Sequence, residues 1–373
     1  LAYIYDGTAM VNGVVRPDGL DLQTSFNDIS IERMLPQSGI TGKVSLLSRV
    51  KGTMDNPQFD GTAASREIHV GGSVVRMVST GVHYRDHVVT LDEGSFRQQG
   101  GSFTWKGNYN VENSSIDGTL KFDNWNAKEI LRMLKVTSDA VDIPVEGGMR
   151  ISGTLDNPSV DFKANILGGH LGATSVGDGV IDFSYMNKAL SIRKMNIPVG
   201  NGVLAAQGGM NSQGDLDIQF AARDMDVSWI PSVLNKKDVK IGGTLTAGVY
   251  LSGNKTKPVA DISIGVDHPS YGDISFDDFS LMANMSDNVF ILQNALITRD
   301  AYKASMKGTI PGAMFGLPVV SDVPIDLDIN LDHADMNILA LFSKAVTSAN
   351  GPIKGHLKVT GAYNDPMIFG GVT

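Results

Sequence analysis

The sequence predicts a mainly β protein, an elongated and curled antiparallel sheet made of repeats of about 100 residues. Each repeat is expected to hold about six strands and one short amphipathic helix. Three observations lead to this prediction: a turn motif that recurs four times, an apolar helical stripe that recurs beside it, and alternation of apolar and polar residues in between. So regular a period is typical of one supersecondary unit stacked on copies of itself.

The turn motif has the form Gly-x-x-x-x-Pro and follows an apolar run. Its copies are Gly52–Pro57, Gly153–Pro158, Gly253–Pro258 and Gly361–Pro366, with prolines 101, 100 and 108 residues apart. The first two copies read Asp-Asn-Pro at their ends, and the third departs from this form. A second marker, Lys106-Gly107, Gln207-Gly208 and Lys307-Gly308, keeps the same step.

These markers predict one continuous array over residues 1–373, which we expect to be a fragment of a longer protein. The predicted parts are a partial repeat (1–57), two repeats (58–158 and 159–258), a repeat with an inserted loop near 311–324 (259–366), and the start of the next repeat (367–373).

Short apolar runs bounded by Gly, Asn, Asp or Pro predict the strands of each repeat. In the second full repeat they are Val160–Leu167, Gly179–Tyr185, Ala189–Ile197, Gly202–Met210, Leu216–Ala222 and Gly243–Gly253. Alternation is strict in Ile325–Asp332, which predicts a sheet with one apolar face and one polar face. A large twisted sheet of this kind must curl, close or be covered, because a flat one would leave its apolar face in water.

An i, i+3, i+4 apolar set predicts the helix of each repeat. The sets are Ile31, Met34 and Leu35; Ile130, Met133 and Leu134; Ile230, Val233 and Leu234; and Ile338, Leu341 and Phe342. The expected N-caps are Asp28, Asn126, Asp226 and Asp335. Two roles are open for these helices: they cap the sheet, or they form a lid over its apolar face.

Composition excludes several classes of function. The net charge of −9 and the isoelectric point near 5.2 disfavour nucleic acid as a partner, since phosphate binding needs a basic face. The chain has no cysteine, hence neither disulfides nor thiolate metal sites. No apolar stretch approaches the length of a membrane-spanning helix, about 20 residues.

Catalytic and metal-binding patterns are weak. His83 and His87 fall on one face of a predicted strand with no third ligand, which indicates a solvated pair. Asp326, Asp328 and Asp332 fit the polar face of an alternating strand better than a calcium loop. We therefore expect no enzyme activity, no cofactor and no metal.

The helix-to-strand passages Ile31–Pro57 and Ile130–Pro158, each ending in the Asp-Asn-Pro turn, resemble the AsmA-like superfamily and most of all its TamB group. The resemblance implies a repeating β-groove, or β-taco, fold of the kind found in bridge-like lipid transfer proteins. It also implies a periplasmic location, with the full-length protein anchored in the inner membrane. The function implied is transfer of phospholipids toward the outer membrane along a hydrophobic groove.

The resemblance implies phospholipid acyl chains as ligands, and a TamA-like outer-membrane barrel protein as a partner of parts outside this fragment. A function of another class stays open: a scaffold that assists outer-membrane protein assembly by pairing its sheet edges with strands of other proteins.

Alternation supplies candidates for the lining of a lipid groove. They are Leu120, Phe122, Leu216, Ile218, Phe220, Phe279, Leu281, Ile325, Leu327, Ile329 and Leu331. The alternative is that these residues pack against one another in a closed core.

The inserted loop is apolar and contains Met314, Phe315 and Leu317. It is a candidate gate for the groove or a contact for a partner. The alternative is a longer hairpin folded onto the nearest apolar edge.

Overall fold

The computed structural model describes residues 1–133, 138–236, 238–318, 323–335 and 352–373. Within them the chain forms 25 strands, assigned to one open antiparallel sheet, with three short α-helices and one 3-10 turn. The mainly β fold and the antiparallel sheet are therefore confirmed. Two compact units are distinguished: unit 1 comprises residues 1–170 and 178–188, and unit 2 comprises 171–177 and 189–373.

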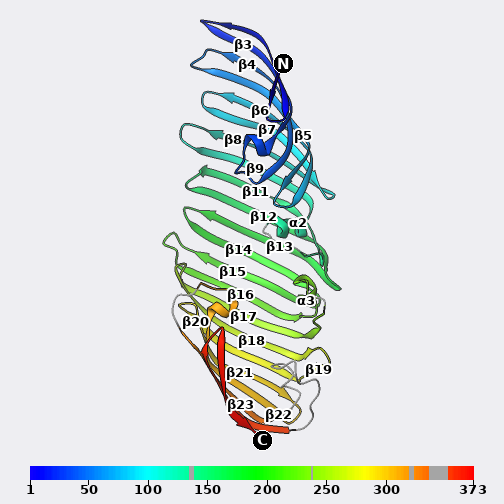
Figure 1. Ribbon diagram of the computed structural model, residues 1–373, viewed down its shortest axis with the longest axis vertical. Helices are drawn as coiled ribbons and strands as arrows, with labels where there is room; N and C mark the ends of the chain where they lie inside the picture. Colours follow the sequence, from blue (N-terminus) through cyan, green and yellow to red (C-terminus); the bar gives the residue numbers. More distant parts are fainter. Residues whose placement is uncertain (134–137, 237, 319–322, 336–351) are drawn as a thin grey trace. The chain divides into compact units, whose positions relative to one another are not determined.

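Within each unit consecutive long strands lie side by side and pair antiparallel (Figure 1). The earlier strands are β1 Ala2–Ile4, β2 Gly7–Arg16, β3 Gly19–Ser30, β4 Ile40–Gly52, β5 Pro57–Val70, β6 Ser73–Arg85, β7 Val88–Gln98, β8 Gly101–Asn110, β9 Ser115–Asn126, β10 Val141–Asp142, β11 Pro144–Thr154, β12 Pro158–Leu171 and β13 Thr174–Met186. The later strands are β14 Ala189–Val199, β15 Gly202–Met210, β16 Leu216–Asp226, β17 Ile241–Asn254, β18 Lys257–Tyr271, β19 Ile274–Ser275, β20 Asp278–Ser286, β21 Val289–Arg299, β22 Tyr302–Pro311, β23 Ile325–Asp335, β24 Pro352–Ala362 and β25 Asp365–Val372. The six strands predicted in the second full repeat all fall within observed strands.

The recurring motif forms a hairpin turn. In its second copy the amide of Asn157 donates to the hydroxyl of Thr154 at 3.2 Å, and Gly153 has a φ of 97°. The first copy has the same bond, from the amide of Asn56 to the hydroxyl of Thr53 at 3.0 Å. Glycine is needed because few other residues adopt this left-handed backbone, and the proline that follows opens the next strand.

The third copy closes its turn with a different side chain. Asn254 stands where the first two copies have threonine, and its Oδ1 accepts the amide of Thr256 at 3.2 Å. An asparagine side chain can mimic a turn of the backbone in this way. The departure in sequence therefore keeps the hairpin.

β-Bulges interrupt three strands at corresponding places. The register shifts between Leu91 and Gly94 in β7, between Ile192 and Met195 in β14, and between Leu292 and Ala295 in β21. Two consecutive polar residues fill each bulge: Asp92-Glu93, Arg193-Lys194 and Gln293-Asn294. A bulge adds one residue to one strand, which would move the following residues to the opposite face of an alternating strand. Because two polar residues stand in the bulge instead of one, the next apolar residue still falls on the apolar face. The bulges lie 101 and 100 residues apart, like the sequence markers.

α1 Ile31–Met34 and α3 Ile230–Val233 each end one residue before their predicted stripe does, and α2 spans Ala127–Met133. In α1, Ile31 is buried but Met34 and Leu35 are exposed; in α3, Ile230 and Val233 are half-buried and Leu234 is exposed. One turn of helix is too short to bury three residues of a 3.6-residue period. The fourth stripe, from Ile338, lies outside the described residues.

The predicted N-caps differ from one another in the structure. Asn126 is a cap: its Oδ1 accepts the amide of Lys128 at 2.9 Å. The Oδ1 of Asp226 accepts the amide of Ser228 at 2.7 Å, in a turn before α3 begins. Asp28 lies within β3 with a φ of 54°, so the prediction of a cap there is wrong. The side chain of Asp335 is not among those described.

We expect Gly308→Ala to destabilise the sheet. Gly308 has a φ of 137°, and a Cβ added there would lie 1.9 Å from the carbonyl oxygen of Asp326. The loss should be about 2 kcal/mol or more, seen as a lower urea midpoint by circular dichroism. Gly248→Ala is the matched control, because a Cβ there meets nothing within 4 Å. Equal midpoints for the two variants would contradict this expectation.

Candidate functional site

The candidate site is the apolar face of the sheet, which is most uniform in unit 2. One row of residues that pair across the strands from β15 to β24 consists of Ala206, Phe220, Val249, Ile262, Ala283, Leu292, Gly308, Leu327 and Val359. The next row consists of Leu204, Ala222, Ala247, Ile264, Leu281, Ala295, Met306, Ile329 and Leu357. Neither row contains a polar side chain.

All the sequence-predicted groove residues lie on such apolar faces, but their exposure differs. Phe122, Ile218, Ile325 and Leu331 are buried, with 3 to 7% of their surface exposed. Leu120, Leu216, Phe220, Phe279, Leu281, Leu327 and Ile329 are half-buried. The half-buried set leaves apolar surface open to a ligand, whereas the buried set is already in contact with its neighbours.

The clusters on this face are formed by residues of neighbouring strands. Ala283, Leu292 and Ala295 pack with partly buried residues of β18, β20, β22 and β23. Ala304, Leu331 and Ile353 form a second cluster with residues of β21, β23 and β24. A third cluster differs, because Trp229, just before α3, packs against it. In the described part of unit 2, these clusters contain no residue of a second sheet layered over the face.

In unit 1 the apolar face carries a continuous group of aromatic rings. Its members are Phe96, Phe103, Trp105, Phe122, Trp125, Phe162 and Phe183, with adjacent ring centroids 4.1 to 6.5 Å apart. Phe103 and Phe122 are the most buried of them, at 2% and 4% exposed. The two units therefore present chemically different apolar faces, aromatic in one and mainly aliphatic in the other.

Hydroxyl groups also interrupt the face in unit 1. The register places Thr24 opposite Ser48, and their hydroxyls are hydrogen-bonded. The hydroxyl of Thr80 donates to the carbonyl of Gly81 at 3.1 Å. Because these hydroxyls have partners, they add little polarity to the face.

The inserted loop folds against the apolar face. The ring of Phe315, at the end of the 3-10 turn η1 (Gly312–Phe315), meets that of Phe290 edge-on with centroids 5.2 Å apart. Phe290 pairs in register with Met285 and Ile310 on that face. Phe315 nevertheless stays 64% exposed.

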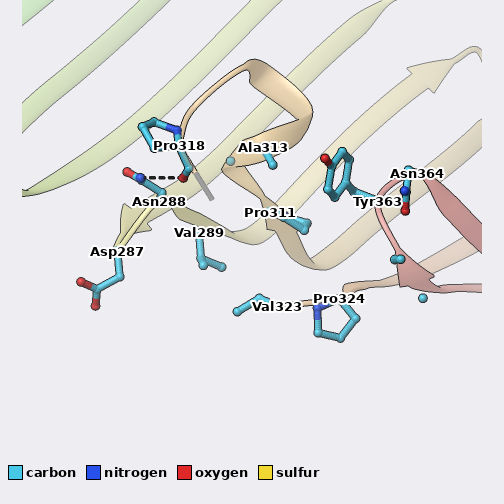
Figure 2. A pocket seen from close by; sticks show the side chains of 13 residues that line it. Asp287, Asn288, Val289, Pro311, Ala313, Pro318, Val323, Pro324, Tyr363 and Asn364 are labelled. Carbon is cyan, nitrogen blue, oxygen red and sulfur yellow. Dashed lines mark hydrogen bonds between the residues drawn. The ribbon is translucent and has the colours of Figure 1, made fainter. Parts of the chain in front are cut away.

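The rest of the loop borders a hollow of about 430 Å³ (Figure 2). The side-chain Nδ2 of Asn288 donates to the carbonyl of Pro318 at 3.0 Å, which ties the loop to the turn before β21. Tyr363 and Asn364, from the fourth copy of the turn motif, lie on the other side. Met314 is exposed and Leu317 half-buried. The described part of the loop thus lies at the apolar edge, and gating remains a prediction.

The opposite face carries cross-strand ion pairs. Lys358 on β24 contacts the carboxylates of Asp326 and Asp328 on β23, and these two carboxylates raise the pKa of Lys358. Lys354 lies 3.9 Å from Asp332 in the same ladder. These aspartates therefore lie on the polar face, as the alternation predicts. The described residues contain no group of three side chains suited to a metal ion.

His83 is placed differently from a simple solvated residue. Its two ring nitrogens lie 2.7 Å from carboxylate oxygens of Asp60 and Asp92 on the neighbouring strands. His87 lies in the turn after β6, with a φ of 65°. The two histidines therefore do not act as a pair.

A buried carboxylate anchors α2, and the sequence patterns did not reveal it. Glu129 is fully buried, and its Oε2 accepts hydrogen bonds from the hydroxyl of Ser73 at 2.8 Å and from the side-chain Nε2 of Gln98 at 3.3 Å. Its Oε1 accepts Nη1 of Arg132 at 2.6 Å. Gln98 in turn accepts the indole N–H of Trp125 at 2.8 Å, which joins this network to the aromatic rings.

Glu129→Ala should destabilise unit 1 by about 3 kcal/mol, because it leaves polar groups of Ser73, Gln98 and Arg132 without their buried partner. Glu129→Gln keeps the shape and one acceptor, so a smaller loss is expected. Urea unfolding followed by tryptophan fluorescence measures both variants. An unchanged midpoint for Glu129→Ala would show that the network does not hold α2.

No family model, curated protein or solved structure matches this chain. Among the described residues, no helix has the length and apolar character needed to cross a membrane.

Proposed function

We propose that this chain is a section of a bridge that carries phospholipids between membranes along a hydrophobic groove. The observation that carries the proposal is the unbroken apolar face of unit 2, whose rows cross the strands from β15 to β24. Its clusters are built from neighbours in the sheet, and half-buried residues such as Phe220 and Leu327 keep apolar surface accessible. An acyl chain lying along a row would meet an apolar position at each strand.

The apolar rows supply the energy that such transfer needs. Each methylene removed from water is worth about 0.8 kcal/mol, so an acyl chain of about 16 carbons costs about 12 kcal/mol to expose. Contact with a row offsets this cost while the headgroup stays in water. Because every position of a row is apolar, no polar contact fixes the acyl chain at one strand, and a lipid moves between positions without leaving the face.

The finer architecture belongs to the same proposal: repeats of about 100 residues, each with about six strands and a short helix, in a sheet curled around its apolar face. Supporting it, the bulges of β7, β14 and β21 recur at the step of the sequence motif. Curling also follows from β-bulges in general, because they increase the local twist of a sheet.

We further propose a TamB-like role within the AsmA-like superfamily, supported by the Asp-Asn-Pro passages that end at Pro57 and Pro158. This role places the chain in the periplasm, as part of a protein anchored in the inner membrane and serving outer-membrane biogenesis. Acyl chains are then its ligands, and a TamA-like barrel protein binds parts outside this chain. No chemical reaction is assigned to it.

A scaffold that pairs with strands of other proteins is the second candidate. It would offer an edge strand of the sheet to the strands of other proteins. Such a strand can accept another by β-augmentation. A bound partner strand would then slow hydrogen exchange of the amides of that edge strand, a change that lipid bound on the side chains of the β15–β24 rows would not produce.

Purified chain should carry phospholipid. We expect native mass spectrometry to show adducts of phospholipid mass after expression in bacteria, and organic extraction to recover phospholipid in proportion to protein. A chain that stays free of lipid even after incubation with phospholipid vesicles would contradict the proposal.

Leu327→Asp should abolish lipid binding while the sheet stays folded, because a carboxylate on the apolar row repels acyl chains. Asn330→Asp adds the same charge to the polar face of the same strand, and should leave binding unchanged. Native mass spectrometry reads binding, and circular dichroism reads folding. If Leu327→Asp unfolds the chain, Leu216→Asp at the start of β16 provides the same test at a half-buried position. Retained binding in a folded apolar-face variant would exclude this face as the lipid site.

A further inference from the structure

We propose that His83 is a proton-dependent clamp on the polar face of unit 1, which ties β5, β6 and β7 together when charged and loosens the β6–β7 joint when neutral. The proposal concerns regulation of the sheet itself and is independent of the ligand carried on the opposite face.

The clamp is defined by two short contacts to different strands. Nδ1 of His83 lies 2.7 Å from Oδ1 of Asp60 on β5, and Nε2 lies 2.7 Å from Oδ2 of Asp92 on β7. The imidazole therefore spans three strands, with a carboxylate at each nitrogen. Its side chain is 34% exposed, so protons exchange freely with solvent.

The protonation state decides how many of these contacts are hydrogen bonds. A neutral imidazole has one N–H and donates once, whereas an imidazolium donates from both nitrogens. Two ionised carboxylates can both accept only from the charged form. Loss of one proton therefore breaks one cross-strand bond and leaves a carboxylate facing a lone pair.

The charges around His83 favour its charged form. Hydrogen bonds to Asp60 and Asp92 raise the pKa of His83 above 6.5, and burial opposes them. On β6 itself, Arg85 donates to both oxygens of Asp60 at 2.9 Å, and on β4 Arg49 stands opposite Asp60 in register. Arg85 holds Asp60 once His83 is neutral, whereas Arg49 is bonded to Asp21, so the bond of His83 to Asp92 is the weaker one.

The sign of the pH dependence follows from this raised pKa. The stabilisation is complete below about pH 6.5, the ordinary pKa of histidine in the unfolded state, and disappears as the pH rises through the folded-state pKa.

The pairing of β6 with β7, which the clamp affects, is already irregular. The β6–β7 register shifts between Arg76 and Ser79 and again between Ser79 and Val82, and Asp92 lies in the bulge of β7.

Unit 2 contains the same bridge in a form that does not titrate near neutral pH. Asn284 on β20 donates from Nδ2 to Asp261 on β18, and accepts at Oδ1 from Nε2 of Gln293 on β21. In sequence, Asp261, Asn284 and Gln293 each lie 201 residues after Asp60, His83 and Asp92. Gln293 also lies in the bulge of its strand, as Asp92 does. The chain thus supplies its own pH-insensitive control.

Hydrogen exchange tests the clamp, with protection factors corrected for the intrinsic pH dependence of exchange. Between pH 6 and pH 9, protection of the β6–β7 hairpin should fall about two- to fivefold relative to the β20–β21 hairpin. The double variant His83→Asn with Asp92→Gln installs the bridge of unit 2, and should remove this difference. Equal pH profiles for the two hairpins in the wild-type chain, or an unchanged profile in a folded double variant, would overturn the proposal.

A direct titration keeps the test independent of how the variants fold. The ring chemical shifts of His83 in the wild-type chain, assigned by comparison with His83→Gln, give its pKa by NMR. The clamp requires a value above 6.5, and a value at or below it would overturn the proposal.

Discussion

Everything in this sheet depends on antiparallel register holding apolar residues on a single face. A slip of one residue would move a whole strand's apolar set to the opposite side, and each bulge threatens such a reversal because it inserts one residue. In β7, β14 and β21 the sequence places two polar residues inside the bulge, so the next apolar residue returns to the apolar face. In β21 this compensation keeps both Leu292 and Ala295 in the rows of unit 2 that support the proposed lipid path.

Features that depend on residues close together in the sequence could be predicted, whereas contacts between residues far apart in the sequence could not. Strand positions follow from alternation and turn residues, which are local, and the predicted strands of the second full repeat all lie within observed ones. The apolar set was predictable for the same reason. The buried Glu129 was not predictable, because its partners are distant in sequence. Ser73 lies 56 residues away and Gln98 lies 31 residues away, and no local pattern joins them to Glu129. The bridge from His83 to Asp60 was equally invisible, although the adjacent polar pair Asp92-Glu93 was a signal for a bulge.

The helices show where periodicity misleads. An i, i+3, i+4 stripe predicts a buried helical side, but in α1 and α3 a single turn leaves Leu35 and Leu234 exposed. α2 is longer, and the buried carboxylate of Glu129 ties it to Ser73 and Gln98 of the sheet. The two units also differ in a way that a repeat would not predict: rings fill the apolar face of unit 1, and aliphatic side chains fill that of unit 2. Corresponding strands can therefore hold the same backbone geometry with different surface chemistry.

The motif turn has a consequence for how such an array changes its length. Its hydrogen bonds close within a few residues, as between Asn157 and Thr154, and do not depend on neighbouring hairpins. A chain cut after one copy and rejoined at the next would keep an intact turn at the junction. Removing six strands in this way shortens the array by about 29 Å, at about 4.8 Å per strand. The turn thus allows the strands between two copies of the motif to be removed or added without a new connection at the junction.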